Sequence, residues 1–150
     1  MSTLTHLRVL LLVCGLIHTG LARLNPELLA IAEINQQYKA AMESGDMNSI
    51  LAPYSENILF LPNGHQSIVG KDKLASYFSS VLPRVGRMEY NIKYLDYINQ
   101  RTGLVLELLT VTVLDKQGNV TLKGRTLLHW KWDPQTRGFK VMLEMINSDQ

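Results

Sequence analysis

Apolar residues recur every three or four positions in the first part of the chain, the spacing of a helix with one buried face. Residues 26–44 follow this pattern throughout, at Leu28, Ile31, Ile34, Tyr38, Ala41 and Met42. Asn25 is a suitable N-cap, and Gly45 is suited to a left-handed helix end. Two shorter helices are predicted over residues 47–52 and 71–81.

The pattern changes to strict alternation from residue 88 onward, which is typical of half-buried strands. Four long strands are predicted, over residues 88–99, 104–114, 120–132 and 139–146. Because short turns connect them, an antiparallel meander is expected. A shorter strand over residues 57–61 and a short run over residues 66–70 precede it. This order predicts an α+β domain in which a curved antiparallel sheet wraps over the N-terminal helices.

The first 22 residues have the layout of a secretory signal peptide. A short basic start is followed by an apolar run over residues 9–17 and by small residues at Gly20 and Ala22. That run is too short to cross the ~30 Å hydrocarbon layer as a helix. We therefore expect a cleaved signal peptide over residues 1–22, a domain over residues 23–150 and a secreted, extracellular protein without a membrane span. A buried N-terminal helix and a short signal anchor are the alternatives.

Composition excludes several kinds of site from the mature domain. The chain has 15 Lys and Arg against 13 Asp and Glu, with no basic cluster, which argues against nucleic acid as a partner. Its single cysteine, Cys14, lies in the predicted signal peptide, so neither disulfide nor thiol chemistry is expected. His65 and His129 are far apart and lack metal-ligand spacing, so we predict no metal site. No cofactor is predicted either.

Four motifs, in this order, resemble the nuclear transport factor 2-like superfamily. The nearest group is the ketosteroid-isomerase-like and SnoaL-like small domains of undefined function. The motifs are QQYKAAMESGDMNSILAPYSEN, ILFLPNG followed by IVGKDKL, GRTLLHWKW, and GFKVMLEMINSD. The match runs from about residue 27 to residue 149. The resemblance implies a cone-shaped cystatin-like α+β roll, in which the sheet and the first helices enclose an apolar pocket.

The resemblance also suggests which residues to examine for catalysis. In the steroid-isomerase branch, a tyrosine and a neutral aspartic acid donate hydrogen bonds to the enolate oxygen, and a second aspartate moves the proton. Tyr38 corresponds to the tyrosine. The two acids correspond to Leu61 or Pro62 and to Leu128, so both carboxylates are absent from their expected places. Steroid-isomerase chemistry by that arrangement is therefore not expected.

Other residues are candidates for the proton shuttle. Asp96 shares a strand face with Tyr90, Ile92 and Tyr94, the less polar face of residues 88–99, so it is expected to face the pocket or else to be solvated at the strand end. Glu144 and His65 are the other candidates. Tyr38 and Asp96 are the predicted catalytic pair. The predicted pocket residues are Tyr38, Leu61, Tyr94, Asp96, Thr126, Leu128, Trp130, Leu143 and Glu144, with His65 at the mouth.

Three functions remain open from the sequence. The first is binding of a small hydrophobic molecule, with Tyr38 as a polar anchor. The second is an isomerase, cyclase or dehydratase that uses Tyr38 with a non-standard proton shuttle. The third is a homodimeric assembly module without a ligand, since many relatives dimerise through the outer face of the sheet. Asn119 begins an N-glycosylation triplet in a predicted turn, where a glycan would be exposed.

Overall fold

The computed structural model describes residues 25–149, so the predicted signal peptide lies outside the described residues. Helix α2 (Pro26–Ser44) starts after Asn25, whose side chain accepts the N–H of Glu27 at 3.0 Å. It ends at Gly45, which has a φ of 75°. Asp46 then caps α3 (Met47–Leu51) by accepting the N–H of Ser49. The predicted helix end and immediate restart are confirmed. No helix within residues 25–149 is long and apolar enough to cross a membrane.

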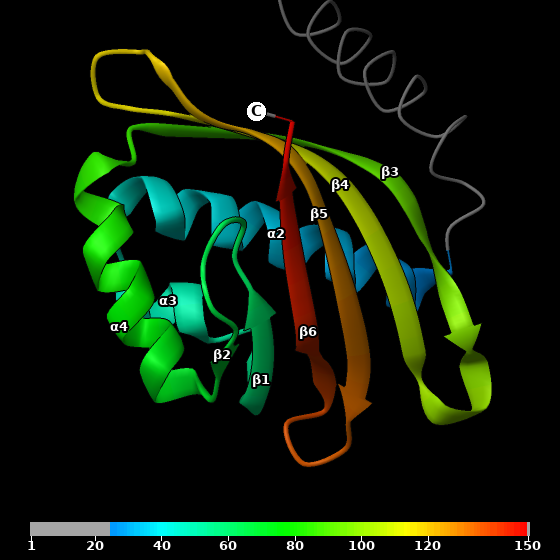
Figure 1. Ribbon diagram of the computed structural model, residues 1–150. Helices are drawn as coiled ribbons and strands as arrows, with labels where there is room; N and C mark the ends of the chain where they lie inside the picture. The colour runs from blue at the N-terminus through cyan, green and yellow to red at the C-terminus, as the bar shows by residue number, and fades with distance from the viewer. Residues whose placement is uncertain (1–24, 150) are drawn as a thin grey trace, which may run out of the picture. The chain divides into compact units, whose positions relative to one another are not determined.

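The strands form one six-stranded sheet in the order β2-β1-β6-β5-β4-β3 (Figure 1). Their bounds are β1 (Tyr54–Leu61), β2 (Ile68–Val69), β3 (Arg87–Asn99), β4 (Leu104–Leu114), β5 (Val120–Asp133) and β6 (Gly138–Ser148). Helix α4 (Lys71–Val81) and the short η1 (Leu82–Arg84) connect β2 to β3, and η2 (Gln100–Thr102) connects β3 to β4. The predicted four-strand meander is confirmed. A purely antiparallel sheet is wrong, because β1 pairs in parallel with β6.

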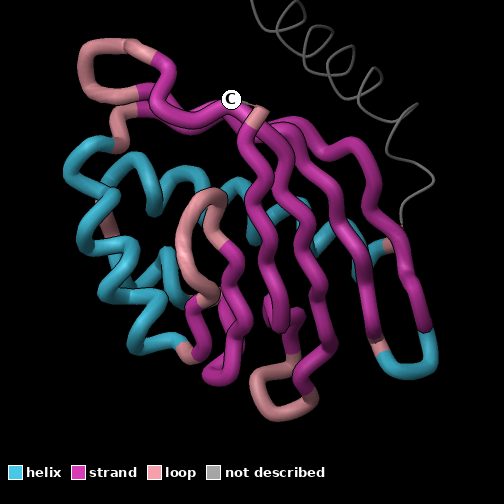
Figure 2. The backbone as a smooth tube through the Cα atoms, in the orientation of Figure 1, coloured by secondary structure: helices cyan, strands magenta, loops and turns pink. Residues whose placement is uncertain are grey.

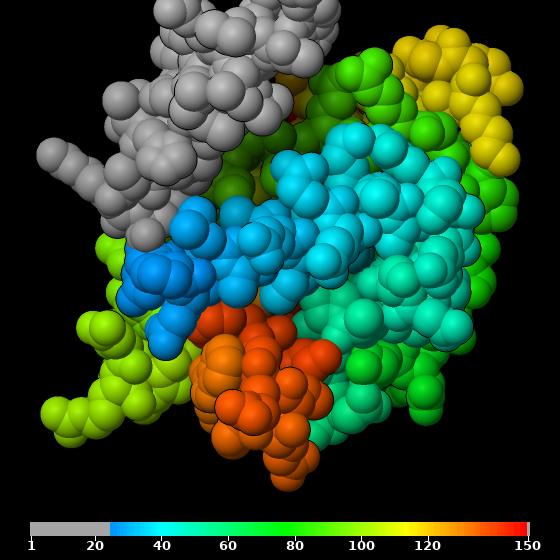
Figure 3. Space-filling model, turned by 180° about the vertical axis from the view of Figure 1, so that it is seen from behind, coloured from blue at the N-terminus to red at the C-terminus, as the bar shows by residue number. Residues whose placement is uncertain are grey.

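Within residues 31–149, the helices cover one face of this sheet, which we call the inner face. Figure 2 shows that the long strands curve along their length. Figure 3, from behind, shows the cyan part of α2 running across the viewer's side of the strands. Phe78 of α4 packs on Phe60 of β1, with ring centroids 5.9 Å apart. The core therefore lies between the helices and the inner face.

The sheet has several register irregularities, and two of them change which of the candidate site residues reach that inner face. Lys93 is an extra residue in β3, because Ile92 pairs with Leu109 whereas Tyr94 pairs with Leu108. Met142 is an extra residue in β6, because Val141 pairs with Trp130 whereas Leu143 pairs with His129. Since side chains alternate between faces, each extra residue reverses the alternation beyond it.

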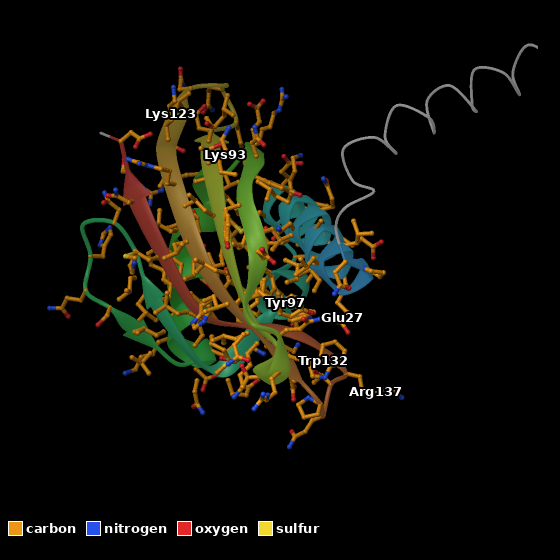
Figure 4. The ribbon with its side chains drawn as sticks, turned by 90° about the vertical axis from the view of Figure 1, so that its right-hand side faces the viewer. Glu27, Lys93, Tyr97, Lys123, Trp132 and Arg137 are labelled. Atoms are coloured by element: carbon orange, nitrogen blue, oxygen red, sulfur yellow. The ribbon has the colours of Figure 1, made fainter. Side chains whose placement is uncertain are left out.

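Both reversals are visible in the burial of the side chains, since Val141 and Glu144 of β6 are both buried although they lie three positions apart. On β3 the inner residues are Met88, Tyr90 and Ile92 before Lys93, and Leu95 and Tyr97 after it. Tyr97 reaches Phe139 of β6 at a ring distance of 6.5 Å. Figure 4 shows Tyr97 and Trp132 near one end of the sheet and Lys123 near the other. The bulged strands therefore still contribute to the core over most of their length.

The opposite, outer face of the sheet carries a continuous row of large apolar side chains. Register pairs place one such residue on each of five neighbouring strands: Tyr94, Leu108, Leu127, Met145 and Leu61. We call these five residues the outer apolar row. Tyr94 is 48% exposed and Met145 40% exposed. Within residues 31–149 no helix covers this face (Figure 1).

Candidate functional site

A cavity of about 380 Å³ lies between the helices and the inner face of the sheet. Its wall is mainly apolar and includes Ile34, Phe60, Phe78, Leu109, Leu128 and Trp130. At one end the wall residues are exposed, among them His65 and Arg84, and this end is the mouth. At the other end the wall contains Glu144, which is only 6% exposed. The cavity thus runs from an open mouth to a buried polar end.

A chain of hydrogen bonds forms that polar end. The hydroxyl of Tyr54, at the start of β1, lies 2.6 Å from Oε2 of Glu144 on β6. The same hydroxyl lies 3.2 Å from the hydroxyl of Tyr38 on α2. Because Tyr54 has one hydroxyl hydrogen, it donates to one of these partners and accepts from the other. Within residues 25–149 Glu144 has no other hydrogen-bond partner, which leaves Oε1 for another group.

Protonation at this end changes near neutral pH. Burial raises the pKa of Glu144 to about 7, against the lowering effect of the Tyr54 hydrogen bond. Burial, followed by the charge of Glu144, raises the pKa of both Tyr38 and Tyr54 far above the ordinary value for a phenol. Both tyrosines therefore stay neutral, and Glu144 is the group whose charge changes.

A second buried carboxyl group lies beside this site but outside the cavity wall. Glu107 of β4 is fully buried. Its Oε1 accepts the side-chain amide of Asn35 at 2.6 Å, and its Oε2 accepts the indole N–H of Trp130 at 2.9 Å. Burial raises its pKa to about 7 and the charge of Glu144 adds to this, whereas the two hydrogen bonds lower it. Glu107 thus fastens α2 to the sheet.

The two carboxyl groups lie on either side of Leu128. Leu128 pairs with Glu107 across β4 and β5, and with Glu144 across β5 and β6. The family resemblance gives Leu128 as the position of a missing acid. The sheet instead supplies acids from both neighbouring strands at the same level, and the one on β6 reaches the cavity.

Several of the residues singled out from the sequence do line the cavity. Its wall contains Tyr38, Thr126, Leu128, Trp130 and Glu144, and His65 lies at its mouth. Asn119 lies in the exposed turn between β4 and β5, where its side chain donates to Asp115. Among residues 25–149, no three His, Cys, Asp or Glu side chains gather as a metal site.

Four predicted pocket positions are wrong. Tyr94 and Asp96 lie on the outer face because Lys93 reverses the alternation in β3, and Asp96 instead accepts the N–H of Tyr97. Leu143 lies on the outer face because of Met142. Leu61 pairs with Met145 of the outer apolar row, while Ile58 and Phe60 face inward. Asp96 is therefore not a base in this cavity.

Sequence reasoning misses Tyr54 and Glu107. Tyr54 escapes it because the alternation predicts a first strand from residue 57, whereas the strand begins at Tyr54. For Glu107 a signal is present, because it alternates with Val105, Leu109 and Val111, which are all buried. An acid within a buried apolar alternation is a strong indication of a specific polar partner.

Comparison with known proteins gives structural neighbours only. No protein-family model and no curated protein matches the chain. A ketosteroid isomerase-like protein from Erwinia carotovora atroseptica SCRI1043 matches with a TM-score of 0.70 and 23% identity, over 85% of this chain and 99% of that one. A domain of unknown function with a cystatin-like fold, from Nostoc punctiforme PCC 73102, has a TM-score of 0.73 and 16% identity, over 85% and 80%.

A third neighbour belongs to the same structural group. It is a protein of unknown function described as NTF2-like, from Pseudomonas putida KT2440, with a TM-score of 0.64 and 15% identity, over 78% of this chain and 82% of that one. These likenesses confirm the α+β fold expected from the four motifs. At such identities they establish the fold and are compatible with a ligand-binding domain.

Proposed function

Proceeding from the nuclear transport factor 2-like fold that this chain has, we propose that the protein binds a small, mainly apolar molecule bearing a carbonyl or hydroxyl oxygen. One observation carries the proposal: the Tyr38–Tyr54–Glu144 hydrogen-bond chain ends an otherwise mainly apolar cavity. Apolar walls with a few convergent polar groups are the usual composition of a small-molecule site.

The hydrogen-bond chain suits an uncharged oxygen at the deep end. When Glu144 is protonated, it donates to Tyr54, Tyr54 donates to Tyr38, and the Tyr38 hydrogen is free for the ligand. When Glu144 is ionised, Tyr54 donates to it and accepts from Tyr38, so the Tyr38 hydrogen must turn away from Tyr54 to reach a ligand. A neutral hydrogen bond of this kind contributes about 1 kcal/mol to binding.

At pH 6, where Glu144 is mainly protonated, replacing Tyr38 with phenylalanine is expected to weaken binding of an apolar ketone about fivefold, the loss of about 1 kcal/mol. We suggest 2-acetylnaphthalene as the probe, titrated by fluorescence. Tyr94→Phe is the matched control, because Tyr94 lies on the outer face, and its affinity should equal that of the wild type. If Tyr38→Phe binds the ketone as tightly as the wild type, Tyr38 only packs. If the wild type does not bind the ketone, this function is wrong for that ligand class.

Catalytic proton transfer is the second candidate, favoured by the placement of Glu144, with a pKa of about 7, in the cavity wall. Ionised Glu144 would remove a proton from the carbon next to a carbonyl, while the Tyr38 hydroxyl turns from Tyr54 to donate to the carbonyl oxygen. The same ketone incubated in D2O would then gain deuterium at that carbon. Exchange that is catalysed by the wild type and abolished by Glu144→Gln would support an enzyme. If the wild type exchanges the proton no faster than buffer does, binding is the only function that is supported.

We also propose that the protein is secreted, on the basis of the layout of residues 1–22. The exposed turn at Asn119 is compatible with a glycan on a secreted protein. The Asn119 amide nitrogen donates to Asp115 at 3.0 Å, and it would keep one hydrogen for this bond when glycosylated.

We further propose a homodimer in which two copies pack through the outer apolar row. The row is symmetric about Leu127, with two strands on each side. A two-fold axis along β5 would place Tyr94 of one copy over Leu61 of the other and the two Leu127 side chains together. Sheets commonly pack face to face in this way, and a two-fold contact needs a self-complementary surface.

Replacing Leu127 with glutamate is expected to yield monomers, because two carboxylates would meet at the centre of the contact. Light scattering across a concentration series measures the mass. Ser76→Glu, on the exposed side of α4, adds the same charge elsewhere and should remain dimeric. A wild-type protein that is monomeric at every concentration contradicts the proposed dimer, as does a dimeric Leu127→Glu variant.

A further inference from the structure

The mouth of the cavity has the opposite electrostatic character to its deep end. Glu144 is the only carboxylate in the wall among the described residues. The mouth is lined by Asn63, His65 and Arg84, which offer an amide, an imidazole and a guanidinium, and by Thr121, whose hydroxyl donates to the carbonyl of Val113. Arg84 forms no ion pair with an acid within residues 25–149. A set of donors without a carboxylate is the composition that binds an anion.

These groups lie on the same end of the molecule. Arg84 lies two residues before Gly86, whose N–H donates to the carbonyl of Leu114 at the end of β4. Thr121 is close to the same place, because it follows Val120, which pairs with Leu114. His65 approaches from the turn between β1 and β2, with its ring 6.3 Å from that of Tyr77 on α4.

Tyr77 connects the two ends electrostatically. Its pKa is raised first by burial and then by the charge of Glu144, and it is lowered by the charge of Arg84. Tyr77 thus lies within electrostatic reach of both the acid and the guanidinium. Along β6, Ser148 at the mouth end of the wall lies four residues beyond Glu144, a distance of about 13 Å.

From this arrangement we propose that the ligand is an amphipathic acid, whose carboxylate lies at the mouth against Arg84 and His65 and whose apolar body fills the cavity. The proposal rests on the proposed binding function and specifies its ligand class. An ionised carboxylate at the deep end would meet the carboxyl group of Glu144, so the ligand enters with its charge outward. The apolar body must span most of the distance of about 13 Å between the two ends.

The experiment compares two acids with their neutral methyl esters: decanoic acid and 2-naphthylacetic acid. Affinities are measured by isothermal titration calorimetry at pH 8, where both acids are ionised. For Arg84→Gln we expect a five- to tenfold weaker affinity for the acids and less than a twofold change for the esters. His65→Gln should act in the same direction, by a smaller factor.

Arg101→Gln is the matched control. It removes the same charge from η2, outside the cavity wall, and should leave all four affinities unchanged. If Arg84→Gln weakens the affinity for acids and esters equally, or changes neither affinity, the proposed carboxylate site at the mouth is wrong, while the proposed binding function stands. If the wild type binds none of the four compounds, the inference and the binding function both fail for these scaffolds.

The pH dependence tests the orientation. With the carboxylate at the mouth, the acid affinity of the His65→Gln variant, which lacks the imidazole there, should change less than twofold between pH 6 and pH 8. A carboxylate placed beside Glu144 would lose more than tenfold affinity as Glu144 ionises, because two like charges would then meet in a buried site. Such a loss, removed by Glu144→Gln, would overturn the proposed orientation.

Discussion

Replacing Glu107 with leucine is expected to lower the free energy of unfolding by about 3 to 4 kcal/mol at pH 5. Leucine removes the acceptor for two buried donors at once, the Asn35 amide and the Trp130 indole. A buried donor left without a partner costs about 1 to 3 kcal/mol. Because the pKa of Glu107 is about 7, the side chain is neutral at pH 5, so no buried charge is relieved by the substitution.

Urea unfolding followed by tryptophan fluorescence measures this change. Glu107→Gln keeps one oxygen acceptor, so its loss should be about half as large. Glu89→Leu is the matched control on the exposed side of β3, where the ion pair with Arg87 contributes less than about 1 kcal/mol. Equal stability of Glu107→Leu and the wild type would show that Glu107 does not fasten α2 to the sheet.

The stability of the wild-type protein is expected to fall as the pH rises from about 5 to 8. In the unfolded chain, Glu107 and Glu144 lose their protons near the ordinary pKa of 4.5, whereas in the folded protein they lose them at about 7. Between these values the folded protein holds more protons than the unfolded chain, so stability decreases with increasing pH. The stabilisation that these two carboxyl groups contribute is fully present below pH 4.5 and is lost as the pH rises through 7.

The expected loss of unfolding free energy is about 3 kcal/mol for either carboxyl group alone. The two losses do not simply add, because the ionisations of the two groups are coupled. Glu144→Gln should reduce the loss between pH 5 and pH 8 by about half, because glutamine does not ionise and still accepts the Tyr54 hydrogen bond. The titratable side chains that interact electrostatically with Glu144 are Tyr54, Tyr38, Tyr77 and Glu107. Of these, only Glu107 changes its charge between pH 5 and pH 8. Urea unfolding at several pH values measures the slope. A flat profile for the wild type would contradict the raised pKa values.

The sequence predicts the structure well where the type and spacing of the residues are enough to indicate which side chains are buried. The helix over residues 26–44 follows from its apolar spacing, its N-cap and Gly45, and its bounds agree with α2. The long strands follow from alternation. Glu107 belongs to the same class, because an acid at the inward position of an apolar strand indicates by its position alone that it is buried.

The sequence is uninformative where the backbone changes the alternation. Neither Lys93 nor Met142 is a residue that marks a bulge, and each fits a regular strand equally well. Regular alternation therefore places Asp96 on the inner face although it lies outside, while the inward position of Glu144 depends on Met142. The position of a bulge is decided by pairing with the neighbouring strand, which is a property of the whole sheet.

The parallel pairing of β1 with β6 also determines when the site can form during folding. Tyr54 and Glu144 are 90 residues apart in sequence, and β6 alone joins the β2–β1 hairpin to the remaining strands. Until the last strand is added, the helical half and the three other meander strands share no strand pairing. Contacts between such distant segments form late and slowly, because the intervening chain must first be ordered. We therefore expect the hydrogen bond between Tyr54 and Glu144 to be among the last to form, and a chain that ends before β6 would lack both Glu144 and the strand that joins the two parts of the sheet.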